Sequence, residues 1–265
     1  MKRILGIVFV VLLAMPLMAV KVKEDTSDTI HFVETRVKAD FTKEFRRGFS
    51  LGLEEEIRAR VFETDQKAYF RGSYTTLHFG YEPIQYVKLE TGYTLRLLGY
   101  KGWDDPNEFI RHRAFFGVIG KYKYGNWRFS LRERLDMNCR TDSVNDHEKA
   151  AIALMLRHRL HVGYYIPGKP WQLYANLELI NTLNQPTKYL NKYYTSEQFG
   201  QYLCNVNAQI GTKWRLNKRN TLSLSYRFEY TYDRDINITK SKGNIELNRV
   251  HGFGHVITLG YDLNW

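Results

Sequence analysis

The sequence predicts an all-β fold, an antiparallel up-and-down transmembrane β-barrel of about 12 strands, with about 10 as the alternative. Three observations favour it. Segments that alternate between apolar and polar residues recur to the end of the chain, their connections alternate between short and long, and tryptophans stand beside the short ones. Alternation alone does not separate a membrane barrel from a soluble β-domain, because it shows only that the two faces of a strand differ.

The first residues have the composition of an export signal. Lys2 and Arg3 precede an apolar stretch, and Ala19 offers a small residue at a cleavage point. We therefore expect residues 1–19 to be a Sec signal peptide and residues 20–265 to form one exported barrel domain. After residue 20, no apolar run reaches the roughly 18 residues that a spanning helix needs. If the protein spans a membrane, we expect it to do so with strands.

Composition limits the alternatives. The formal net charge is +11, but the Lys and Arg residues alternate with apolar ones and form no charged block, so we expect no nucleic-acid partner. Cys139 and Cys204 are too few for a disulfide framework, and we favour free thiols. The histidines show no ligand spacing, so neither a metal nor a cofactor is expected.

A two-residue period identifies eleven candidate strands, with ends accurate to about 2–4 residues. They cover residues 30–46, 49–62, 67–81, 85–99, 109–124, 127–140, 150–166, 170–183, 199–216, 220–234 and 248–264. The third alternates poorly, which favours a bulge. Because bacterial single-chain barrels have an even number of strands, we expect about 12, with a short extra strand within residues 20–28, or about 10 if one candidate is wrong.

The clearest hairpin turns at Gly125-Asn126. After the turn, apolar side chains such as Leu131 point one way and Arg132 and Arg134 point the other. The other tight connections are 46–48, 82–84, 167–169 and 217–219, whereas those at 101–108, 141–149, 184–198 and 235–247 are longer and polar. Short periplasmic turns and longer outer loops are typical of outer-membrane barrels.

Aromatic residues mark one end of the predicted barrel. Trp127, Trp171, Trp214 and Trp265 lie beside tight turns or at the chain end, with Tyr124 and Tyr164 nearby. Such residues favour the boundary between hydrocarbon and headgroups, so we expect a ring at one interface.

The last strand shares one apolar face down to its terminal aromatic residue. Tyr261, Leu263 and Trp265 on that face are similar to the terminal signal that the barrel-assembly machinery of Gram-negative bacteria recognises. We therefore expect that machinery, outer-membrane lipid and lipopolysaccharide as partners.

Four segments resemble the family grouped as domain of unknown function 2490: Glu56-Ile57-Arg58, RHRAFFGVIGKYKYGNWRFSLRERLD, LRHRLHVGYYIPGKPWQLYANLELIN and HVITLGYDLNW. The resemblance covers most of the chain after residue 20. It implies a β-barrel in the cell outer membrane and no particular activity. A weaker similarity in architecture links the chain to the narrow oligogalacturonate porins.

If the apolar face meets lipid, charged side chains line the lumen. Six arginines fall on three consecutive strands, and pairing two of these strands about their loop sets Arg132 opposite Arg159 and Arg134 opposite Arg157. The expected lumen residues are Arg111, Arg113, Arg132, Arg134, Arg157, Arg159, Glu54, Glu56, Arg58, Glu178, Arg227 and Glu229. They predict a narrow channel or solute-binding barrel with a basic wall facing an acidic one, favouring small anionic or oligomeric solutes.

Two alternatives remain. The charges could pair across the lumen and plug it, which would make a structural barrel. The same strand pairing also sets Glu133 opposite His158 on the outer face, where some outer-membrane lipid-modifying hydrolases keep a Ser/His/Glu set. No serine falls beside this pair, so we assign no catalytic residue and keep the hydrolase as an alternative.

Overall fold

The computed structural model describes residues 21–64, 68–99, 110–139, 150–190, 195–239 and 244–265. The expected signal peptide and the expected loops at 101–108 and 141–149 lie outside these residues. The strands are β1 (Lys21–Glu44), β2 (Phe49–Glu63), β3 (Tyr69–Ile84), β4 (Val87–Leu98), β5 (Ile110–Tyr124), β6 (Trp127–Cys139), β7 (Ile152–Tyr165), β8 (Trp171–Leu190), β9 (Thr195–Arg215), β10 (Asn220–Thr239) and β11 (Asn244–Asn264), with a short 3₁₀ turn, η1 (Arg46–Gly48), after β1. No helix in this part of the chain is long and apolar enough to cross a membrane, a finding that concerns helices alone.

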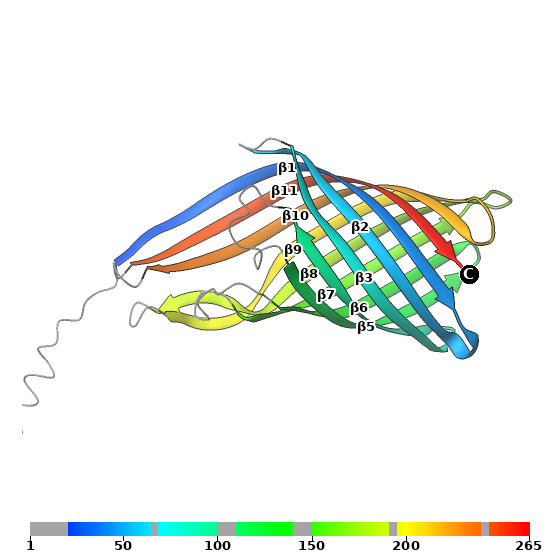
Figure 1. Cartoon of the computed structure of the whole chain (residues 1–265), viewed down its shortest axis with the longest axis horizontal. Helices are drawn as coiled ribbons and strands as arrows, with labels where there is room; N and C mark the ends of the chain where they lie inside the picture. The colour runs from blue at the N-terminus through cyan, green and yellow to red at the C-terminus, as the bar shows by residue number, and fades with distance from the viewer. Residues whose placement is uncertain (1–20, 65–67, 100–109, 140–149, 191–194, 240–243) are drawn as a thin grey trace, which may run out of the picture.

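The strands form one closed barrel in which consecutive strands are antiparallel (Figure 1). The described chain contributes eleven strands, so the expectation of 12 or 10 was wrong. An odd number of up-and-down strands leaves the first and last pointing the same way, and β1 closes on β11 as a parallel pair, with Val37 opposite Leu259. The evenness rule fails here because it assumes an antiparallel closing pair. Residues 21–28 form no separate strand; they are the start of β1.

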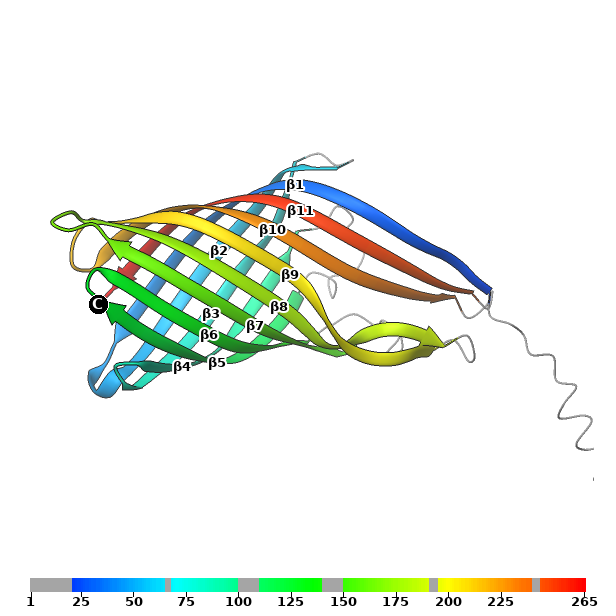
Figure 2. The same ribbon diagram turned by 180° about the vertical axis from the view of Figure 1, so that it is seen from behind.

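The expectation of outer loops at residues 184–198 and 235–247 was also wrong. Residues 184–198 and 235–247 lie mostly in the β8–β9 and β10–β11 hairpins, which pair as far as Leu190–Thr195 and Thr239–Asn244. Both hairpins project beyond the barrel body at the same end (Figures 1 and 2). Alternation indicates a strand only where one face meets an apolar environment, and these tips extend past it. The expected bulge in β3 is confirmed, since Arg58 pairs with Gly72 and Ala59 with Phe70.

Burial is inverted relative to a water-soluble protein. Leu131 and Leu177 are 51% and 46% exposed, whereas Glu34, Asp136 and Glu178 are at most 5% exposed. In a soluble β-domain the apolar face would be buried and the charged face solvated. Apolar side chains outside and charged ones inside are the arrangement of a barrel that stands in lipid.

Outward-facing histidines have partners within the sheet. The ring of His112 is bonded to the Tyr93 hydroxyl, His255 to Tyr226 at 2.6 Å and His251 to Tyr230 at 2.9 Å. Polar groups that face hydrocarbon need a partner inside the protein, because no water is available to replace it.

The expected aromatic ring is confirmed at the short-turn end. The Trp127 ring lies 4.8 Å from that of Tyr164, and Trp171 stacks on Trp214 with 5.4 Å between centroids. Trp265 is half exposed at the end of the chain, where its backbone is hydrogen-bonded to β1. These rings mark one interface of the apolar belt.

The orientation of the two faces can be tested at adjacent positions of β6. Leu131→Arg should lower the free energy of unfolding by about 2–4 kcal/mol, because it places a guanidinium in lipid near the middle of the belt. Ser130→Arg, on the lumen face, should cost clearly less. Unfolding in denaturant after refolding into vesicles measures both, and the opposite ranking would show that the faces are reversed.

Candidate functional site

A cavity of about 330 Å³ lies in the middle of the lumen. Ten basic side chains line it: Arg36, Lys38, Arg58, Lys88, Arg113, Arg132, Arg134, Arg157, Arg159 and Arg227. Five acidic ones do so: Asp40, Glu54, Glu56, Glu90 and Glu178. All of these residues face inward because the outward positions of the same strands are apolar. The cavity wall therefore carries an excess of positive charge.

The arginines gather on β5, β6 and β7 as the sequence predicts. Arg132 lies opposite Arg159 and Arg134 opposite Arg157, which confirms the predicted register. Like charges opposed on a sheet repel one another, so carboxylates from other strands must reach them. Gly117 gives Glu90 this access: a Cβ at Gly117 would lie 2.9 Å from the Glu90 carboxylate, which extends to within 3.8 Å of Arg132.

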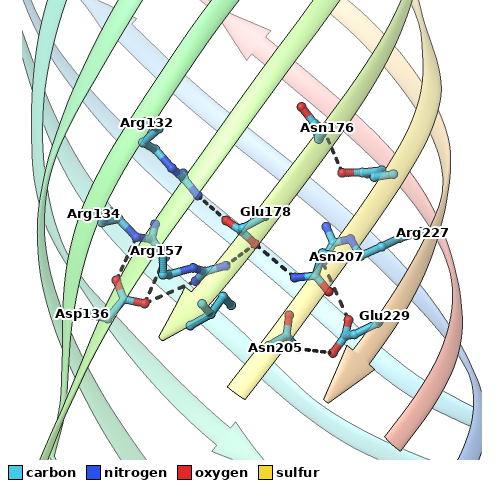
Figure 3. Close-up of polar contacts among 12 residues, drawn as sticks. Arg132, Arg134, Asp136, Arg157, Asn176, Glu178, Asn205, Asn207, Arg227 and Glu229 are labelled. Carbon is cyan, nitrogen blue, oxygen red and sulfur yellow. Dashed lines mark hydrogen bonds and ion pairs between the residues drawn. The ribbon is translucent and has the colours of Figure 1, made fainter. Parts of the chain in front are cut away.

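Glu178 on β8 holds the centre of the arginine cluster. Its carboxylate accepts hydrogen bonds from Arg132 at 2.9 Å, from Arg157 at 2.8 Å and from Asn207 at 3.2 Å (Figure 3). One carboxylate thus joins side chains from four neighbouring strands, β6 to β9. It neutralises one of the two guanidinium charges that it contacts.

Asp136 on β6 is the second shared carboxylate. It contacts Arg134 at 2.8 Å and Arg157 at 3.3 Å (Figure 3). It also lies 3.7 Å from Arg113 and is 1% exposed. Arg134 also lies over the Phe115 ring, 4.6 Å from its centroid, so the ring supports the guanidinium from one side.

The opposite wall is mixed, which corrects the expected acidic wall. Glu54 contacts Lys38 at 2.6 Å, and Glu56 contacts Arg58 at 2.5 Å. Further along the same wall, Arg36 contacts Glu229 at 3.2 Å. Each acid that the sequence placed here has a basic neighbour on its own or a nearby strand, which the alternation within a single strand could not reveal.

Ion pairs in the lumen run along the wall. Every ion pair between described side chains joins positions on one strand or on strands at most two apart, for example Arg36 on β1 with Glu229 on β10. Two cations that line the cavity, Arg159 and Lys88, have neither an ion-pair nor a hydrogen-bond partner among the described residues. Both positive charges therefore face the cavity without a neutralising partner on the described wall.

The expected lumen residues divide in two. Ten of the twelve line the central cavity, whereas Arg111 and Glu229 lie further along the wall. Sequence reasoning missed cavity residues on β1 and β4: Arg36, Lys38, Asp40, Lys88 and Glu90. The alternation that identified the candidate strands 30–46 and 85–99 already puts these residues on the polar face, but the expected lumen residues did not include them.

A second basic cavity, of about 300 Å³, lies at the short-turn end. Its lining includes Lys169, Lys213, Arg215 and Lys218. A row of neutral polar groups stands between the two cavities, linked by hydrogen bonds from His161 to Asn176 at 2.6 Å, Asn176 to Gln209 at 3.0 Å and Gln209 to Ser225 at 2.7 Å. The polar lining therefore continues from the centre of the lumen to this end.

The Glu133–His158 pair faces outward, and the two side chains are hydrogen-bonded. The other register neighbours are Val118 for Glu133 and Leu179 for His158, so no hydroxyl nucleophile stands directly beside the pair on the described strands. Both cysteines are free. Within the described residues, no group of three or more His, Cys, Asp or Glu side chains is placed to hold a metal ion.

Comparison with known proteins identifies a family. The family described as "Protein of unknown function (DUF2490)" matches residues 35–239. Among solved structures, the porin NanC superposes with a TM-score of 0.44 at 10% identity, over 72% of this chain and 78% of that one. OmpT, an outer membrane protein of Vibrio cholerae, gives 0.32 at 10% identity, over 79% and 88%. A search of curated proteins finds no match.

Removing the shared carboxylate of Glu178 should destabilise the barrel strongly. Glu178→Gln removes the closest carboxylate from two buried guanidiniums, those of Arg132 and Arg157, and leaves each only its more distant partner, so the free energy of unfolding should fall by about 3–5 kcal/mol. The control is Glu82→Gln, which breaks an exposed pair with Lys121 and should change that energy by at most about 1 kcal/mol. Equal effects in denaturant unfolding would contradict the role of Glu178.

Proposed function

We propose that this chain, which belongs to the DUF2490 family, is an outer-membrane barrel whose lumen binds small anionic solutes and passes them through a narrow channel. The single observation that carries the proposal is the charge imbalance of the central cavity, where ten basic side chains face five acidic ones. A wall of this kind attracts anions and repels cations, as rings of charged side chains do in other pores. Arginine suits carboxylate and phosphate groups in particular, because its fork can donate two parallel hydrogen bonds.

The arrangement of the ion pairs supports a channel over a plugged structural barrel. Pairs that follow the wall give most of the cavity arginines a carboxylate without joining opposite walls, and Arg159 and Lys88 keep their charge available. A plug would need contacts between opposite walls, and the ion pairs between described side chains provide none.

A lipid-modifying hydrolase has less support. The outward Glu133–His158 pair could orient a base, but Val118 and Leu179 occupy the register positions where a nucleophile would be needed. The pair is better explained as two polar side chains that satisfy each other in lipid.

Charge reversal in the lumen tests the channel. Arg132→Glu combined with Arg159→Glu should abolish or invert anion preference, because it changes the local charge by about four units where water screens it poorly. Reversal potentials in a potassium chloride gradient across a planar bilayer measure this preference. Glu133→Gln with His158→Gln is the control and should leave permeation unchanged, since these side chains face outward. Unaltered anion preference in the arginine variant would contradict the proposal.

We further propose that Tyr261, Leu263 and Trp265 form the signal for the barrel-assembly machinery, with outer-membrane lipid and lipopolysaccharide around the mature barrel. Trp265→Asp should reduce the folded protein recovered from outer membranes several-fold, because it puts a charge on the outward stripe of the closing strand. Thr258→Asp, on the lumen face of the same strand, is the control. Normal recovery of the Trp265 variant would argue against the signal.

A further inference from the structure

The β9–β10 seam opens toward one end of the barrel. The pairing of these strands ends at Asn205–Thr231, although β9 continues with β8 and β10 continues with β11. Beyond this point the two hairpins diverge into separate arms (Figure 2). We call this point the fork. It is the place on the described wall where two neighbouring strands separate while both continue.

Side chains, in place of backbone hydrogen bonds, close the fork. The Tyr202 ring on β9 packs edge-on against Tyr232 on β10 with 5.6 Å between centroids, and the Tyr202 hydroxyl lies 3.5 Å from Asp233. Arg234 stacks near both rings and donates to the Tyr232 hydroxyl at 2.7 Å. A contact made of side chains can part without breaking a β-ladder. Aromatic residues at this position also suit the membrane interface.

A cavity of about 400 Å³ lies behind these side chains, a size within the roughly 300–1,000 Å³ of small-molecule sites. Its inner wall is largely apolar, with Ala153, Met155 and Ile180, in contrast to the charged central cavity. The buried Thr182 also lines it, and the Thr182 hydroxyl has no hydrogen-bond partner. We call it the fork pocket.

The fork pocket and the central cavity adjoin along the same strands. On β7, Met155 lines the fork pocket, and the next lumen-facing residue, Arg157, lines the central cavity. On β8, Ile180 and Glu178 stand in the same relation. An apolar compartment therefore leads directly to a cluster of guanidiniums. From Ala153 to Arg157 the strand rises about 13 Å, a span that an extended alkyl chain can fill.

We propose that the fork admits a single-chain anionic amphiphile from the membrane, with its alkyl chain in the fork pocket and its anionic headgroup at Arg157 and Arg159. This inference rests on the proposed function for its headgroup site and adds the class of solute and its route. Charge and shape both favour this ligand: the guanidiniums select an anion, the apolar wall selects an alkyl tail, and the unpaired Thr182 hydroxyl can donate to a headgroup oxygen on entry.

Photolabelling of the folded protein in phosphatidylcholine vesicles tests the site. The probe is dodecanoate with a diazirine at its methyl end, and mass spectrometry locates the adducts. We expect adducts on the peptides of Met155, Ile180 and Tyr202 that excess dodecanoate suppresses, whereas dodecyltrimethylammonium and butyrate do not. Adducts only on outward-facing positions would overturn the proposal.

Matched variants separate the pocket from the surrounding lipid. Ala153→Trp fills the pocket and should lower labelling at least about fivefold, as expected from overpacking. The adjacent Leu154→Trp faces outward and should label like the wild type. Arg157→Gln with Arg159→Gln should also lower labelling. Equal labelling in the two Trp variants would count against the pocket.

Closing the fork tests the route. Tyr232→Cys, in a Cys139→Ser background, places a thiol one residue beyond Thr231, where the ladder ends, and the native Cys204 stands one residue from Asn205 on β9; both positions line the fork pocket. Oxidation or a short bis-maleimide links the two strands. Linked protein should lose pocket labelling while it keeps chloride permeation, and the unlinked form of the same protein should retain both. Labelling that survives the link would overturn lateral entry. Chloride selectivity without pocket labelling would overturn this inference alone, whereas pocket labelling without chloride selectivity would overturn the channel.

Discussion

The constraint on which this structure depends is the two-residue alternation of a closed barrel. Every strand has one face toward lipid, so each charged side chain in the belt must point into the lumen or find a partner beside it. The lumen therefore collects guanidiniums on β5, β6 and β7 that would repel one another if left alone. Shared carboxylates resolve this conflict. Glu178 and Asp136 each contact two or more arginines, and Gly117 leaves the space through which Glu90 approaches.

Sharing of this kind links the stability of the barrel to its chemistry. Because one carboxylate forms ion pairs with several guanidiniums, the network links neighbouring strands and keeps a net positive charge. Arg159 stands next to the shared carboxylate of Glu178 without a direct contact, and Lys88 lies on a neighbouring part of the wall. The same arrangement that gives most of the buried arginines a carboxylate leaves Arg159 and Lys88 without one, and we propose that these two groups meet the anion. The polar row through His161 and Asn176 extends this lining toward the second basic cavity at the short-turn end.

Most of the fold could be predicted from the sequence because lipid imposes alternation on every strand. Pairing the two strands about the centre of the sequence between them predicted Arg132 opposite Arg159, and β6 and β7 have this register. The number of strands could not be predicted, since no local pattern distinguishes an antiparallel closing pair from the parallel pair between β1 and β11. The projecting arms were missed because outside the apolar belt neither face has to be apolar. The partners of Glu54 and Glu56 were missed because they depend on the alignment of β1 with β2 and on same-strand neighbours.

Anomalous diffraction from crystals grown in bromide would test the proposal that the lumen holds anions. Bromide replaces chloride at cationic sites and can be located without bias from the protein. We expect the strongest ordered bromide within the belt to lie in the central cavity, beside Arg159 and the adjoining guanidiniums. Bromide bound only at the loops and outer rim, with the central cavity empty of it, would contradict anion binding in the lumen.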